Sequence, residues 1–146
     1  MIGGVIMLWG INGYSVGRPH NLGLKNNMLA PCPSSPNCVL SQASDANHKI
    51  KPIYYATSLE TAKERLNQVI LSMDGTRIIT QDEVYWHAEF TTRWLSFIDD
   101  VEFYFHESEA LIHLRSASRS GYWDLGVNRK RTKEIRSRFE ELAKGD

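Results

Sequence analysis

Two cysteines near the start of the chain could carry disulfide or thiol chemistry. Cys32 and Cys38 are the only cysteines among the 146 residues, and Pro33 and Pro36 lie between them. A disulfide needs Cα atoms roughly 4.4–6.8 Å apart, so the intervening residues must fold back. Prolines restrict φ, and the serines and the asparagine between the cysteines favour turns. We therefore expect a disulfide, and the alternative is a loop with two reduced thiols.

The spacing of the cysteines argues against a metal or redox role. Zinc sites usually place paired cysteines closer together, and the chain has no second pair, although His48 could supply a third ligand. Thioredoxin-like chemistry uses Cys-x-x-Cys, which is not the pattern seen here. We predict neither a metal site nor a cofactor.

Ionisable side chains form a second candidate site, because three stretches of sequence alternate like neighbouring β-strands. These stretches are 84–94, 99–106 and 111–119. Apolar residues occupy every second position, so the residues between them share the opposite face of a sheet. If the strands are neighbours, that face gathers His87, Glu89, Arg93, Glu102, Tyr104, His113, Arg115 and Arg119.

Three interpretations of this polar face remain open. Cross-strand ion pairs, such as Glu89 or Glu102 with Arg115, would suit a face that is open to solvent. Arginines could instead bind the carboxylate or phosphate of a small anionic ligand. A catalytic or metal site is the third interpretation, and the metal version would use His87, Glu89 and His113 as two histidines and one carboxylate. A register slip of one residue would scatter the set.

Residues 116–128 are another candidate, because this stretch is rich in glycine, serine and aromatic residues. A helix that begins after such a loop can bind an anion at its N-terminus. The chain has no Walker A or dinucleotide-binding pattern and no nucleophile elbow, so these sites are not expected. We expect Tyr122 and Trp123 to anchor the core.

The elements that position these residues follow from hydrophobic periodicity. Residues 49–56 suggest an edge strand, and Thr57-Ser58-Leu59-Glu60 is typical of a capping box that opens a helix ending near Gly75. Residues 76–81 form the next expected strand. Asp124 is the expected N-cap of a terminal helix with a core stripe of Val127, Arg131, Ile135, Phe139 and Leu142. The order predicts an α+β fold, an antiparallel sheet of about five strands with two helices on one face.

Charge and composition restrict the domain organisation and the partners. Seventeen basic residues balance seventeen acidic ones, which argues against a nucleic-acid-binding protein. Residues 1–17 carry no charged side chain, and we expect a signal-like or membrane-anchoring segment there; the alternative is a segment buried against the domain. An extended lead-in at 18–48, which contains the cysteines, and a single domain at 49–146 should follow.

Several stretches together resemble one bacterial and plastid family, domain-of-unknown-function family 1499. The resemblance spans Pro31 to Leu142 and is carried by Pro31-Cys32-Pro33-Ser34-Ser35-Pro36-Asn37-Cys38 with Ser41-Gln42, by His87-Ala88-Glu89-Phe90-Thr91-Thr92-Arg93, by Asp99-Asp100-Val101-Glu102-Phe103, and by the run from Arg115 to Arg129. It implies an envelope or lumenal location for many relatives, and it supplies no activity or catalytic residues.

We therefore expect an envelope-associated binding or structural module with a polar sheet face. The alternative is an enzyme of unknown class that uses His87, Glu89 and Arg115. The expected location is the cell envelope, periplasmic or membrane-anchored, and the alternative is the cytoplasm. Possible partners are a small anionic ligand, an envelope protein, and a membrane contacted through the N-terminus.

Overall fold

The fold is a six-stranded antiparallel sheet with two helices, seen in a computed structural model that describes residues 17–145. The predicted α+β class is confirmed, whereas the expected signal or anchor falls almost wholly outside the described residues. The strands are β1 (Cys38–Leu40), β2 (Ile53–Tyr54), β3 (Thr76–Gln81), β4 (Tyr85–Thr91), β5 (Ile98–His106) and β6 (Leu111–Ser118). The helices are α1 (Leu59–Ser72) and α2 (Val127–Ala143), and a 3₁₀ turn, η1 (Glu107–Glu109), joins β5 to β6. The order in the sheet is β1-β6-β5-β4-β3, and β2 also pairs with β6.

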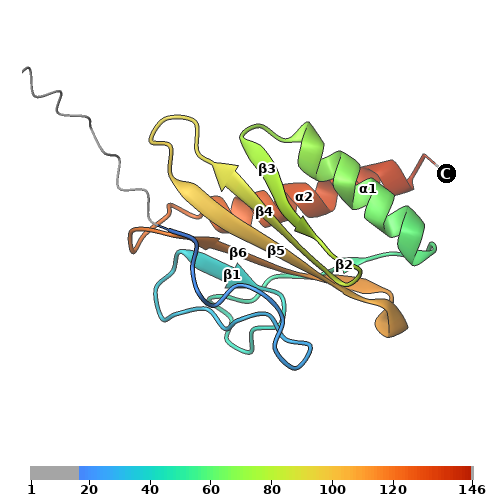
Figure 1. The fold of residues 1–146 in the computed structure, drawn as a ribbon, viewed down its shortest axis with the longest axis horizontal. Coiled ribbons are helices and arrows are strands. Elements are labelled where there is room, and N and C mark those ends of the chain that lie inside the picture. The colour runs from blue at the N-terminus through green and yellow to red at the C-terminus, as the bar shows by residue number, and fades with distance from the viewer. Residues whose placement is uncertain (1–16, 146) are drawn as a thin grey trace, which may run out of the picture.

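The hydrophobic core lies between the sheet and the two helices (Figure 1). Helix α1 buries Leu66 and Ile70, and helix α2 buries Ile135 and Phe139. The facing side chains of the sheet are Trp86, Ala88, Phe90, Val101, Phe103, Phe105, Ile112 and Leu114. These side chains sit at alternate positions of β4, β5 and β6, because a strand presents every second residue to the same side.

The register of the sheet brings the polar side chains onto the opposite face. His87 pairs with Glu102, which pairs in turn with Arg115 on β6. We expected this face to meet solvent or a ligand. Instead, the chain's own lead-in, residues 18–48, runs across it (Figure 1), and it also contributes β1 to the sheet. Glu102 is fully buried and His87 is 3% exposed, so an open sheet face is the wrong description.

Some helices and strands begin or end at other residues than expected, because local hydrogen bonds or loops set their ends. Ser58, rather than Thr57, is the N-cap of α1, because its side chain accepts the Thr61 N–H. Gly126, rather than Asp124, is the N-cap of α2, and the Asp124 carboxylate, two residues earlier, accepts the N–H groups of Gly126 and Asn128. The expected strand at 49–56 is reduced to the two residues of β2. Among residues 17–145, no helix is both long and apolar enough to cross a bilayer.

Several expected core residues are exposed. Strand β4 ends at Thr91, so Arg93 and Trp94 lie in a hairpin loop, and Trp94 is 90% exposed. Tyr122 and Trp123, expected as core anchors, are also largely exposed. At the two ends of the stripe on α2, Val127 and Leu142 are exposed, whereas Ile135 and Phe139 are buried.

Candidate functional site

Glu102 lies at the centre of the polar face and is held by three donors from different parts of the chain. The guanidinium of Arg115 lies 3.3 Å from one carboxylate oxygen, and the other oxygen accepts the Tyr85 hydroxyl at 2.7 Å and the Gly23 N–H at 2.9 Å. Burial, together with the adjacent Glu102 carboxylate, raises the pKa of Tyr85, so its hydroxyl stays a donor. These three donors satisfy the buried carboxylate.

A second carboxylate, Asp100, organises the neighbouring part of the face. Arg119 donates two hydrogen bonds to it, each 2.8 Å long, and His87 Nε2 lies 2.7 Å away. Burial alone would raise the pKa of Asp100, but the hydrogen bonds from Arg119 and His87 outweigh burial and lower it. Arg119 also reaches Glu89 at 3.1 Å, and Arg18 of the lead-in reaches the other oxygen of Glu89 at 2.8 Å.

These contacts attach the lead-in to the sheet. Three guanidinium groups (Arg18, Arg115, Arg119) face three carboxylates (Glu89, Asp100, Glu102). Arg115 additionally donates to the carbonyl of Ala30 at 2.8 Å, and its other end lies 3.5 Å from the carbonyl of Pro31. The polar face is therefore a charge-balanced interface between two parts of one chain.

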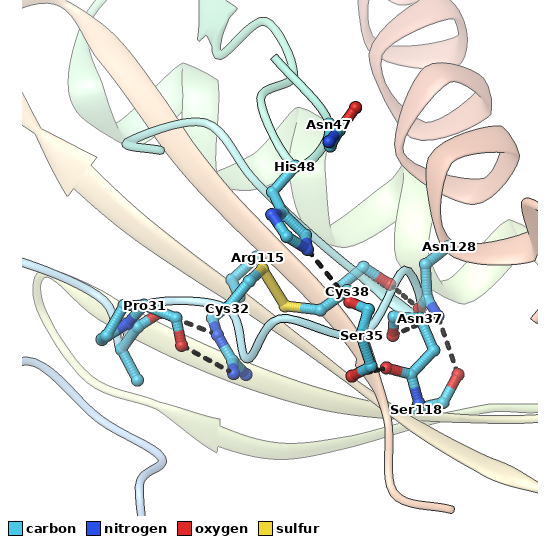
Figure 2. The surroundings of a disulfide bond; sticks show 12 residues. Pro31, Cys32, Ser35, Asn37, Cys38, Asn47, His48, Arg115, Ser118 and Asn128 are labelled. Atoms are coloured by element: carbon cyan, nitrogen blue, oxygen red, sulfur yellow. Dashed lines mark hydrogen bonds between the residues drawn. A yellow bond between two sulfur atoms is a disulfide. The ribbon is translucent and has the colours of Figure 1, made fainter. Parts of the chain in front are cut away.

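The disulfide is confirmed. Cys32 and Cys38 are joined, with their Cα atoms 5.7 Å apart, and Figure 2 shows the bridge beside Arg115. Cys38 begins β1 and pairs with Ala117 of β6. The other end of the sequence braces the same loop, because Asn128 of α2 donates to the carbonyl of Asn37 at 3.2 Å.

His48 holds the disulfide loop from the other side and is not placed as a third ligand to the cysteines. Its Nε2 lies 2.9 Å from the carbonyl of Ser35, and its Nδ1 lies 2.6 Å from the Asp45 carboxylate (Figure 2 shows the first of these bonds). The Ser35 carbonyl and the Asp45 carboxylate raise the pKa of His48 against the opposing effect of burial. The imidazolium form, which can donate from both nitrogens, is thus favoured by the fold.

We expect His48 to stabilise the protein most at acidic pH. Because its pKa is raised in the folded state, its contribution is complete below the unfolded value of about 6.5 and is lost as the pH rises through the folded value. The difference in unfolding free energy between wild type and His48→Gln should therefore be larger near pH 5 than near pH 8, both being round values on either side of that pKa. Urea denaturation at the two pH values measures it, and a difference that grows with pH would contradict the assignment.

A cleft of about 420 Å³ beside the disulfide reaches the polar face. Arg115 of β6 and Arg119, which follows the end of β6, both line it, and Ala117 of β6 lies between them in the sequence. The small side chain of Ala117 leaves space between the two longer ones. The remaining lining comes from Pro19, Asn21, Pro31, Cys32, Pro33, Asn37, Cys38, Asp100 and Ser118.

The eight predicted site residues divide into groups. Six of them (His87, Glu89, Glu102, Tyr104, His113 and Arg115) occupy the polar face in the predicted alternation, and Arg119 reaches it from just beyond β6. Arg93 lies outside it, in the hairpin loop. Three residues were missed: Asp100 and Tyr85, which the alternation of the strands already placed on this face, and Arg18, for which the sequence held no signal.

The alternative metal set is not assembled. His113 packs at the far side of the face, where its ring stacks on Tyr104 at 6.0 Å and its Nδ1 lies 2.9 Å from the Ser41 hydroxyl. His87 is bonded to Asp100, and Glu89 to two arginines. Over residues 17–145, no cluster of three or more histidine, cysteine, aspartate or glutamate side chains could hold a metal ion.

Comparison with known proteins gives one match. A family model described as a protein of unknown function (DUF1499) matches residues 28–139. Neither a curated protein nor a solved structure matches the chain. The matched residues include the disulfide, the whole sheet and most of α2.

Proposed function

Because this chain belongs to the family of unknown function DUF1499, we propose its function from its own geometry: it is an envelope-associated binding module that holds a small anionic ligand in the cleft beside the disulfide. The observation that carries the proposal is the placement of Arg115 and Arg119 on either side of Ala117 in the lining of that cleft. Guanidinium groups bind carboxylate and phosphate oxygens through paired hydrogen bonds.

The chemistry of the cleft favours a negatively charged ligand of modest size. Two guanidinium groups and one carboxylate, Asp100, line it, together with the neutral residues Asn37 and Ser118. The arginines are already oriented by their contacts with the carboxylates of the polar face, so little side-chain entropy is lost when a ligand binds.

The proposed location is supported by the disulfide. Disulfides persist in oxidising compartments such as the periplasm and are rare in the cytosol. Cys38 is 1% exposed and Cys32 is partly buried, so one sulfur of the bridge lies in the folded interior.

Binding is favoured over catalysis by the way the rival residues are held. An enzyme built on His87, Glu89 and Arg115 would need these side chains to meet at one accessible point. Instead, His87 is bonded to Asp100 and is 3% exposed, while Glu89 and Arg115 are paired with different partners.

We expect phosphate or citrate to raise the melting temperature of the full chain. A ligand at a hundred times its Kd stabilises a protein by about 2.7 kcal/mol, or about 5–10 °C for a chain of this size. Ala117→Leu should abolish the shift, because the larger side chain fills the cleft and leaves every charge in place. Ala56→Leu, at an exposed position far along the chain, is the matched control. An equal shift in both variants, or no shift with either anion, would refute the cleft as the binding site.

A further inference from the structure

Exposed apolar side chains gather at one end of the sheet, on two loops. The hairpin loop between β4 and β5 presents Trp94, Leu95 and Phe97, and the loop between β6 and α2 presents Tyr122, Trp123 and Leu125. We call these six residues the apolar end. Trp94 is 90% and Leu125 is 83% exposed. The two loops are neighbours in space, since five of the six residues line a shared hollow of about 650 Å³.

Hydrogen bonds hold the backbone of both loops, so the apolar side chains are exposed at fixed positions. Thr92 closes the hairpin loop, because its N–H bonds the Phe97 carbonyl at 2.8 Å and its hydroxyl accepts the Phe97 N–H at 2.9 Å. The second loop is fixed by Asp124, whose carboxylate accepts bonds from Gly126 and from the fully buried Asn128. Leu125 lies between these bonds in the left-handed region, with φ of 56°, and its side chain points away from the core.

We propose that the apolar end inserts into the interfacial region of a lipid bilayer. Tryptophan and tyrosine are enriched where proteins meet the headgroup level of a membrane, and leucine and phenylalanine supply the part that enters the acyl boundary. Arg93 stands within the hairpin loop and lines the same hollow, where it can meet anionic headgroups.

A membrane is the favoured partner of the apolar end because of where the uncharged N-terminal segment joins the fold. Residues 1–17 carry no charged side chain. The segment joins at Arg18, which is bound to Glu89 near the end of β4, and Glu89 is also bound by Arg119, directly before the second loop. Figure 1 shows the described chain starting at the end of the sheet that carries both loops. An apolar segment and an apolar end on the same side can therefore meet one bilayer together.

Quenching by brominated lipid tests the insertion directly. The full chain carries four tryptophans, Trp9, Trp86, Trp94 and Trp123, and Trp86 is buried in the core. In a Trp9→Phe background, vesicles of brominated phosphatidylcholine and phosphatidylglycerol should quench most of the exposed tryptophan emission. The further substitutions Trp94→Phe and Trp123→Phe should remove that quenching, because only Trp86 remains.

Affinity for the same vesicles gives a second, independent readout. Leu95→Ser with Leu125→Asn should weaken flotation with vesicles by about tenfold or more, since both substitutions remove apolar surface that would leave water on insertion. The matched control is Tyr54→Ser with Leu71→Ser, which removes two exposed apolar side chains elsewhere on the surface. Unchanged melting temperatures would show that all variants fold.

Three results would overturn the proposal. Vesicle binding without quenching of Trp94 and Trp123 would leave the N-terminal segment as the sole contact. Concentration-dependent association without lipid would assign the apolar end to a second copy of the chain. Emission typical of buried indole in the absence of both lipid and association would mean that residues 1–16 cover the apolar end. Neither assay depends on anion binding in the cleft, so the membrane proposal and the anion-binding proposal can fail independently.

Discussion

Replacing Arg119 with methionine should lower the free energy of unfolding by about 3–5 kcal/mol, because breaking a buried ion pair leaves an uncompensated charge. Arg119 donates two bonds to Asp100, which is 1% exposed, and one to Glu89. Methionine preserves much of the apolar stem and removes the guanidinium. Asp100 would keep only His87 as an ionisable partner among the contacts described above.

The same chain supplies a matched control for this substitution. Arg18 contacts the same carboxylate, Glu89, but its side chain is 51% exposed. Arg18→Met should therefore cost less than about 1 kcal/mol, as exposed ion pairs usually do. Urea denaturation of the two variants compares a buried and an exposed member of one network. If both substitutions lower the free energy of unfolding equally, burial of Asp100 does not determine the loss of stability.

The effect of Arg119→Met should also depend on pH in a defined direction. The lowered pKa of Asp100 means that its contribution to stability is present above the unfolded value of about 3.9 and is lost as the pH falls through the folded value. The stability difference between wild type and Arg119→Met should therefore be largest near neutral pH and should shrink in acid. A difference that grows in acid would contradict the role given to Asp100.

Removal of the disulfide should have the second-largest effect and should leave the fold intact. In the chain-entropy description, a bridge that closes so short a loop stabilises by about 2–3 kcal/mol. The double substitution Cys32→Ser with Cys38→Ser removes it. The lead-in should stay in place, because Val39 and Leu40 still pair with β6 and the arginines still bind across the polar face.

Thermal denaturation and thiol titration check this expectation together. A reducing agent should lower the melting temperature of the wild type but not that of the double variant. Protein that has never been reduced should show no reactive thiol, even after unfolding. Two free thiols there would contradict the bridge, and they would argue for a reducing compartment instead.

The sequence was sufficient to predict which side chains share a face of the sheet. Val101, Phe103 and Phe105 alternate with Glu102 and Tyr104, and in a strand that alternation has one geometric meaning. The disulfide could also be predicted from the sequence, because the prolines and turn residues act within a few positions of each cysteine. These predictions rest on local physics, which a short window of sequence contains.

The cover over the polar face was not predictable in the same way. The bond from Arg18 to Glu89 joins residues 71 positions apart, and nothing periodic in the lead-in marks it. The prediction that aromatic side chains of the loops lie in the core was wrong for a related reason. Tyr122 and Trp123 were expected in the core, whereas Asp124 shapes their loop, and the expected strand 84–94 ends early at a hairpin loop that Thr92 closes. The hydrophobicity of a side chain indicates that it favours burial, but it does not identify the surface that buries it.

The two ends of the described fold depend on each other, which has a consequence for the order of assembly. Asn37 near the start and Asn128 near the end meet across 91 positions, and Arg129 bonds the carbonyls of Asn47 and Lys49. Contacts this distant in sequence form late, because closing long loops costs entropy before any contact rewards it. A nascent chain that ends before α2 would lack these bonds at Asn37, Asn47 and Lys49, whereas β1 and the arginines of the polar face could already attach the lead-in to the sheet. Helix α2 therefore adds the final contacts to the loops around the disulfide after the lead-in has met the sheet.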